Sequence, residues 1–188
     1  MKDYIKYYDL EKYLFDEVYK NYHKSKKLNT FEFFAIVIWK ANRAKSKTAK
    51  RLLKLHQERN HNTDLGKCVE EITSKVYSAK THKERMRILY EEYEFKLPMA
   101  SAILTVLYPK DFTVYDVRVC EILKNDKNIN NLSNFDNVWK GYQEFVEDVK
   151  SSTKEKLSLR DKDKALWGKS FYNQLIQDIK ENFPKRTN

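Results

Sequence analysis

Apolar residues recur at a helical spacing along most of this 188-residue chain. Between Leu10 and Tyr22 they fall at positions 10, 14, 15, 18 and 22, which is the 3.6-residue period of an amphipathic helix. Three glycines and three prolines are too few for a turn-rich β-sandwich, for collagen or for a glycine-based nucleotide-binding loop. We therefore expect an all-α fold, a compact globular bundle of about 8–10 helices.

Capping residues and prolines set the expected helix boundaries. Thr30 is the expected N-cap of a helix that is apolar nearly all round and should therefore be central in the core. Pro98 fits the first turn of an uncharged helix over residues 97–107, which should be buried and closely packed. Two long helices are expected near the end of the chain, over about 135–152 and 159–183.

The length predicts one domain over residues 1–188, or two closely packed helical lobes with an active-site cleft between them. The first residues lack the apolar core of a secretory signal, and the longest apolar run, 33–39, is shorter than the ~20 residues of a membrane span. We expect a cytoplasmic monomer with no membrane partner. The two cysteines and four histidines show no zinc-binding spacing, so we expect neither a metal nor a cofactor.

The net charge of +10 is concentrated between Lys20 and Lys54. Eleven basic residues and one acidic residue, Glu32, lie in this segment, whereas the rest of the chain holds 26 basic and 26 acidic residues. Such a local surplus is typical of a surface that binds a polyanion, because lysine and arginine contact phosphates without regard to base sequence. The alternative is an ordinary solvated surface in a lysine-rich protein.

One segment, residues 97–119, carries a more specific pattern: a small-residue helix, a short loop, and Asp116 at the start of the next helix. It resembles the core of the helix-hairpin-helix DNA glycosylases, whose loop ends in an aspartate within a pattern like V-D-x-x-V-x-R. Here the pattern reads Val114-Tyr-Asp116-Val-Arg118-Val119, and Met99-Ala100 matches the family's "V-A" pair. The segment is most similar to a bacterial branch with a "P-V-A-S-A-I-L-T … D-V-R" core.

Two positions depart from that family. The glycines of its G-V-G hairpin let the backbone approach a DNA phosphate, but the matching residues here are Glu94-Phe95-Lys96. Lys96 would then contact phosphate by charge. Bifunctional members carry a lysine that forms a Schiff base where this chain has Pro98. The resemblance therefore implies a monofunctional enzyme that uses water, unless Lys40 or Lys96 takes the place of that lysine.

The resemblance implies that Asp116 is the catalytic residue. Cleavage of the bond between base and deoxyribose builds positive charge on the sugar, which an ionised carboxylate stabilises while it orients the attacking water. The N-terminus of a helix helps to keep such a carboxylate ionised. Aspartate is also a preferred N-cap, so capping the helix is the alternative role of Asp116.

The resemblance further implies that the target base leaves double-stranded DNA and enters a pocket. The expected pocket residues are aromatic: Trp39, Tyr108, Tyr115 and Trp167. The expected DNA contacts are basic: Lys40, Arg43, Lys45, Lys47, Lys50, Arg51, Lys54, Lys96 and Arg118. The polar segment 59–62 is the candidate for a wedge that fills the gap in the stack.

These observations favour a DNA glycosylase that removes a damaged or modified base, in repair or in defence against modified foreign DNA. One alternative is a non-catalytic helical module that binds DNA through the basic 40–54 face. A second is a helical interaction domain for an acidic protein partner. An Asp116→Asn variant separates the first two classes, since a binding module does not need the charge of Asp116. Salt-insensitive binding to protein would favour the third.

Overall fold

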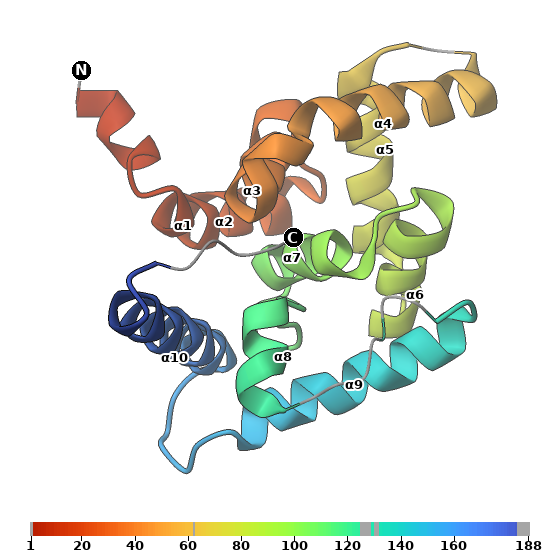
Figure 1. Cartoon of the computed structure of the whole chain (residues 1–188). Helices are drawn as coiled ribbons and strands as arrows, with labels where there is room; N and C mark the ends of the chain where they lie inside the picture. Colours follow the sequence, from red (N-terminus) through yellow and green to blue (C-terminus); the bar gives the residue numbers. More distant parts are fainter. Residues whose placement is uncertain (1, 62, 125–128, 130–131, 184–188) are drawn as a thin grey trace. The chain divides into compact units, whose positions relative to one another are not determined.

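The computed structural model describes residues 2–61, 63–124, 129 and 132–183. Over these residues the chain is helical or forms connecting loops and contains no strand, which confirms the expected all-α class. The chain divides into two compact units, Met1–Pro109 and Lys110–Asn188 (Figure 1). In the described part of the chain, no helix combines the length and hydropathy of a membrane span.

The first unit contains the elements from η1 to α7. They are η1 (Lys2–Tyr7), α1 (Leu10–Tyr13), η2 (Leu14–Val18), α2 (Tyr19–Ser25), α3 (Thr30–Ala41), η3 (Asn42–Ala44), α4 (Lys45–Asn60), α5 (Leu65–Ser78), α6 (His82–Arg87), η4 (Ile88–Glu92) and α7 (Leu97–Leu107). The segments η2 and η4 are single π-helical turns that continue α1 and α6 without a break. Single π-helical turns of this kind, with hydrogen bonds from residue i to i+5, occur inside α-helices.

The helix α7 is central in the core of this unit. Every residue of α7 except Pro98 and Met99 is buried, and the helix packs against α3. Pro98 lies in its first turn, as expected. The Thr105 hydroxyl donates to the Ser101 carbonyl at 2.7 Å, so this polar side chain is satisfied inside the core. The prediction of a buried, closely packed helix over 97–107 is therefore confirmed.

The N-cap of α3 is Asn29, one residue before the expected Thr30. The Asn29 side chain accepts from the Glu32 backbone N–H at 2.9 Å, and the Glu32 carboxylate accepts from the Asn29 N–H at 3.1 Å. These two bonds form a capping box, in which the glutamate three residues after the cap decides between two good capping residues. The prediction of Thr30 as the cap is therefore wrong, and Thr30 is the first residue of the helix.

The second unit contains α8 (Val117–Leu123), α9 (Phe135–Ser151) and α10 (Leu159–Lys180). The last two helices agree with the ranges expected from the sequence, about 135–152 and 159–183. The core of this unit is aromatic, and Phe112, Tyr142 and Phe145 are fully buried in it. The helix α10 packs against α8 and α9, but it also exposes a row of large apolar side chains: Trp167, Phe171, Tyr172, Leu175, Ile176 and Ile179.

Candidate functional site

Asp116 is the N-cap of α8 and lies at the end of an extended loop. Its carboxylate Oδ1 accepts a hydrogen bond from the Arg118 backbone N–H at 3.0 Å. The side chain is half-buried at the helix N-terminus. The capping role is confirmed, and it leaves a carboxylate at the position where the resemblance places the catalytic aspartate.

The loop that leads to Asp116 is held by a buried tyrosine of α9. The Tyr142 hydroxyl donates to the Thr113 carbonyl at 2.7 Å and accepts from the Thr113 N–H at 3.1 Å. Tyr142 is 1% exposed, so both backbone groups of Thr113 are satisfied away from water.

A buried carboxylate of α10 lies close to the same loop. The Asp163 carboxylate pairs with Arg160. Asp163 is 2% exposed, and burial raises the pKa of its carboxyl, although the Arg160 guanidinium and the nearby Val114 backbone oppose that rise. Tyr142 of α9 therefore fixes the backbone that leads to Asp116, and the buried Asp163 of α10 lies close to the same loop.

Figure 1 shows α10 beside α8, against which it packs. The helix α10 carries an exposed aromatic pair near Arg118 in the first turn of α8. Trp167 and Phe171 of α10 stack in parallel, with ring centroids 5.8 Å apart. The Arg118 guanidinium lies over the Trp167 ring at 5.3 Å. Trp167 remains 44% exposed, so part of its surface is open to a planar ligand.

The four expected pocket residues are divided between the two units. Tyr115, in the second unit, is 8% exposed and packs edge-on against Phe145, with burial raising its pKa to about 12. Trp39, in the first unit, is half-buried and packs edge-on against Phe15. Tyr108, also in the first unit, is half-buried in a cluster with two histidines and Arg85 that sequence reasoning did not single out.

The basic residues of the expected 40–54 face differ in their surroundings. In the described part of the chain, the exposed side chains of Arg43, Lys47 and Lys50 have no hydrogen bond and no carboxylate partner. Lys45 donates to the Asn42 side chain at 2.8 Å, and Lys54 lies 3.8 Å from the Glu58 carboxylate. Lys40 is half-buried.

Arg51 points into the first unit. Its guanidinium donates to the Glu94 carbonyl at 2.9 Å and lies 4.7 Å from the centre of the Phe95 ring. Arg59, eight residues further along α4, donates to the Glu92 carbonyl. Both arginines therefore hold the turn between η4 and α7, and each uses its guanidinium to bind a main-chain carbonyl of the protein.

That turn takes a glycine-like conformation. Glu94 has φ 54°, in the left-handed region that glycine adopts at no cost, and it stands where the resemblance places a glycine. The Phe95 N–H donates to the Leu89 carbonyl at 2.9 Å and closes the turn. Lys96 follows as the exposed N-cap of α7.

The expected wedge segment 59–62 is partly outside the described residues, because Asn62 is not among them. The side chains of Arg59 and Asn60 are engaged by Glu92 and Glu71. His61 ends α4 in a left-handed conformation and is exposed.

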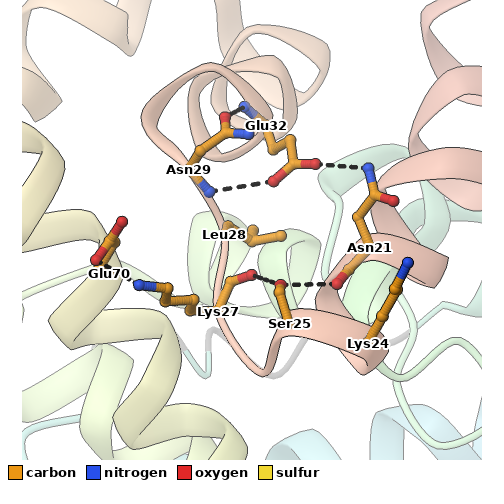
Figure 2. A pocket seen from close by; sticks show the side chains of 8 residues that line it. All are labelled: Asn21, Lys24, Ser25, Lys27, Leu28, Asn29, Glu32 and Glu70. Atoms are coloured by element: carbon orange, nitrogen blue, oxygen red, sulfur yellow. Dashed lines mark hydrogen bonds and ion pairs between the residues drawn. The ribbon is translucent and has the colours of Figure 1, made fainter.

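A cavity of about 270 Å³ lies between α2, the start of α3 and α5. Figure 2 shows the Glu32 carboxylate between Asn29 and Asn21, whose amide donates to it at 2.9 Å. On the other side, Lys27 pairs with Glu70 at 2.7 Å. All of these bonds join one residue of the cavity wall to another. They stabilise the α3 cap and the turn after α2, and they do not indicate a bound ligand.

Among the described residues, no group of three or more histidine, cysteine, aspartate or glutamate side chains is arranged to hold a metal ion. No protein-family model matches the sequence, and neither a curated protein nor a solved structure matches it.

Proposed function

We propose that this protein is a monofunctional DNA glycosylase, which hydrolyses the N-glycosidic bond of a damaged or modified base. The observation that carries the proposal is the position of Asp116. Its half-buried carboxylate lies at a helix N-terminus, on a loop that two hydrogen bonds from Tyr142 hold, and Arg118 and an exposed Trp167 lie nearby.

In this proposal the aromatic pair receives the base and Asp116 acts on the sugar. A base that has left the stack lies against the exposed part of the Trp167–Phe171 pair. As the bond from C1′ to the base breaks, the Asp116 carboxylate stabilises the positive charge on the sugar. Water then adds its hydroxyl to C1′, and its proton balances the charge of the departing base.

The first unit would hold the DNA backbone. The turn at Glu94 keeps the left-handed backbone conformation of a glycine hairpin, and Lys96 adds a cation beside it. Arg43, Lys47 and Lys50 offer exposed, uncompensated charges to further phosphates. Pro98 has no amine, so the proposed reaction ends with an abasic site in an intact strand.

The test is mass spectrometry of free bases released from DNAs that carry oxidised, alkylated, deaminated or phage-type modified bases. Asp116→Asn should lower base release at least about 100-fold, while asparagine preserves the cap. The matched control is Asp64→Asn, which changes an aspartate that caps α5 in the same way and should leave base release unchanged. Full activity of Asp116→Asn, or no release from any of these DNAs, would overturn the proposal.

The exposed cations of the 40–54 face favour a second candidate function, a DNA-binding module without chemistry. Such a module would bind DNA with a strong dependence on salt, release no base, and bind equally well as Asp116→Asn.

A further inference from the structure

A cluster of polar aromatic and basic side chains surrounds Tyr108 at the end of α7. The Tyr108 hydroxyl lies 3.1 Å from the Tyr22 hydroxyl. The Arg85 guanidinium lies 4.6 Å from the centre of the Tyr108 ring, and the rings of His23 and His82 contact it edge-on at 5.7 and 6.2 Å. The cluster joins α2, α6 and α7 within the first unit.

Arg85 in this cluster is a half-buried cation whose charge no anion balances. Within the described residues it pairs with no carboxylate, and its Nε is buried without a hydrogen-bond partner. Its one hydrogen bond is from NH1 to His82 Nδ1, at 3.4 Å. Arg87 on the same helix differs, since its Nε pairs with Glu91 at 3.2 Å. Leaving a buried polar or charged group unpaired is costly, so the site is built to gain from a bound anion.

The neighbouring side chains hold Arg85 in place, and a second positive charge lies on the same group of aromatic rings. The Leu107 carbonyl accepts from His23 Nε2 at 2.9 Å, and His82 Nδ1 accepts from Arg85. Lys26 lies over the Tyr77 ring, which in turn contacts Tyr22. The planar guanidinium of Arg85 carries several N–H donors in a fixed fork, which suits a tetrahedral oxyanion with several acceptor atoms.

We infer that Arg85, flanked by His82, His23 and Tyr108, binds a phosphate group. The site lies in the first unit and does not depend on the proposed glycosylase activity. The phosphate belongs either to a small monoester, such as a nucleotide, or to the diester backbone of DNA.

The experiment is an NMR titration of the full chain with inorganic phosphate, a nucleoside 5′-monophosphate and the dinucleotide dTpdT, against sodium chloride at matched ionic strength. The side-chain Nε–H signal of Arg85 and the imidazole signals of His23 and His82 should shift saturably. Shifts with inorganic phosphate and the nucleoside monophosphate but not with dTpdT identify a monoester ligand, and shifts with dTpdT identify a backbone phosphate. No saturable shift with any of these probes, or equal shifts with chloride, would overturn the inference.

Variants of two neighbouring arginines sharpen the test. Arg85→Gln should weaken binding about 10- to 100-fold, the effect of losing a charge-assisted hydrogen bond. Arg87→Gln, the matched control on the same helix, should bind as the parent does. Arg85→Lys keeps the positive charge but lacks the planar guanidinium with its paired N–H donors, so it should bind phosphate several-fold more weakly. Unchanged binding by either Arg85 variant counts against the site.

Discussion

Arg51 of α4 donates a hydrogen bond to the carbonyl oxygen of Glu94, 2.9 Å away, and covers the adjacent Phe95 ring. The same helix carries Lys47 and Lys50 outward, with no partner among the described side chains. One basic segment therefore does two different things: part of it holds the turn between η4 and α7, and part of it leaves positive charge at the surface.

The left-handed conformation of Glu94 predicts that glycine is better than glutamate at this position. A non-glycine residue at φ 54° pays a steric cost of about 1–2 kcal/mol, which exceeds the added freedom of glycine in the unfolded chain. Glu94→Gly should therefore raise the free energy of unfolding in urea by up to about 1 kcal/mol. Glu91→Gly, at a right-handed position in η4, should lower it by about 1 kcal/mol. A similar loss from both substitutions would mean that the turn is not strained.

The exposed cations predict a salt-dependent contact with DNA. Each phosphate contact contributes a slope of about −0.9 to the plot of log affinity against log salt concentration. Replacing Lys47 and Lys50 by glutamine should weaken binding and flatten that slope by about 2, as measured by fluorescence anisotropy. Lys154 and Lys156, exposed in the loop before α10, serve as the control pair. An unchanged slope in the first variant would identify the 40–54 face as an ordinary solvated surface.

Local signals explain what could be predicted from the sequence. The positions of α7, α9 and α10 follow from apolar periodicity and from Pro98, and the cap at Asp116 follows from one side chain and the helix after it. The cluster of Tyr22, Arg85 and Tyr108 could not be predicted in this way, because residues far apart in sequence meet there only through packing. The inward turn of Arg51 has the same origin, since its partner lies 43 residues further along the chain.

The dense packing of α7 predicts that it has no room for a larger side chain. Ala102 is fully buried, and leucine in its place would overpack the core at a cost of about 1–3 kcal/mol. Met99→Leu, at a half-buried position of the same helix, conserves volume and should cost less than about 1.5 kcal/mol. Thermal and urea unfolding measure both. A fully stable Ala102→Leu variant would show that this helix is more loosely packed than the structure indicates.

Burial predicts an unreactive thiol in the first unit. Cys68 is fully buried, and burial raises the pKa of its thiol to about 11. Because only the thiolate reacts, Cys68 should be labelled far more slowly than a free thiol at pH 8, with a rate that rises as the pH approaches that pKa. A Cys120→Ser variant isolates Cys68, and labelling in denaturant should restore the full rate. Rapid labelling of the folded Cys120→Ser variant would contradict the buried environment.

The two hydrogen bonds between Tyr142 and Thr113 can be removed by one substitution, whose effects on protein stability and on the placement of Asp116 can be measured separately. Tyr142→Phe keeps the ring but leaves the N–H and carbonyl of Thr113 unpaired in the core, which should cost about 1–3 kcal/mol. The loop would then hold Asp116 less firmly. If Asp116 acts as proposed, the rate constant for base release should fall about 10-fold or more in conditions where the variant is fully folded, with little change in DNA affinity. Tyr172→Phe, at an exposed site on α10, should change stability by less than about 0.5 kcal/mol and leave the rate as it is. A folded Tyr142→Phe protein that releases base at the full rate would show that the remaining contacts of the loop are enough to place the carboxylate.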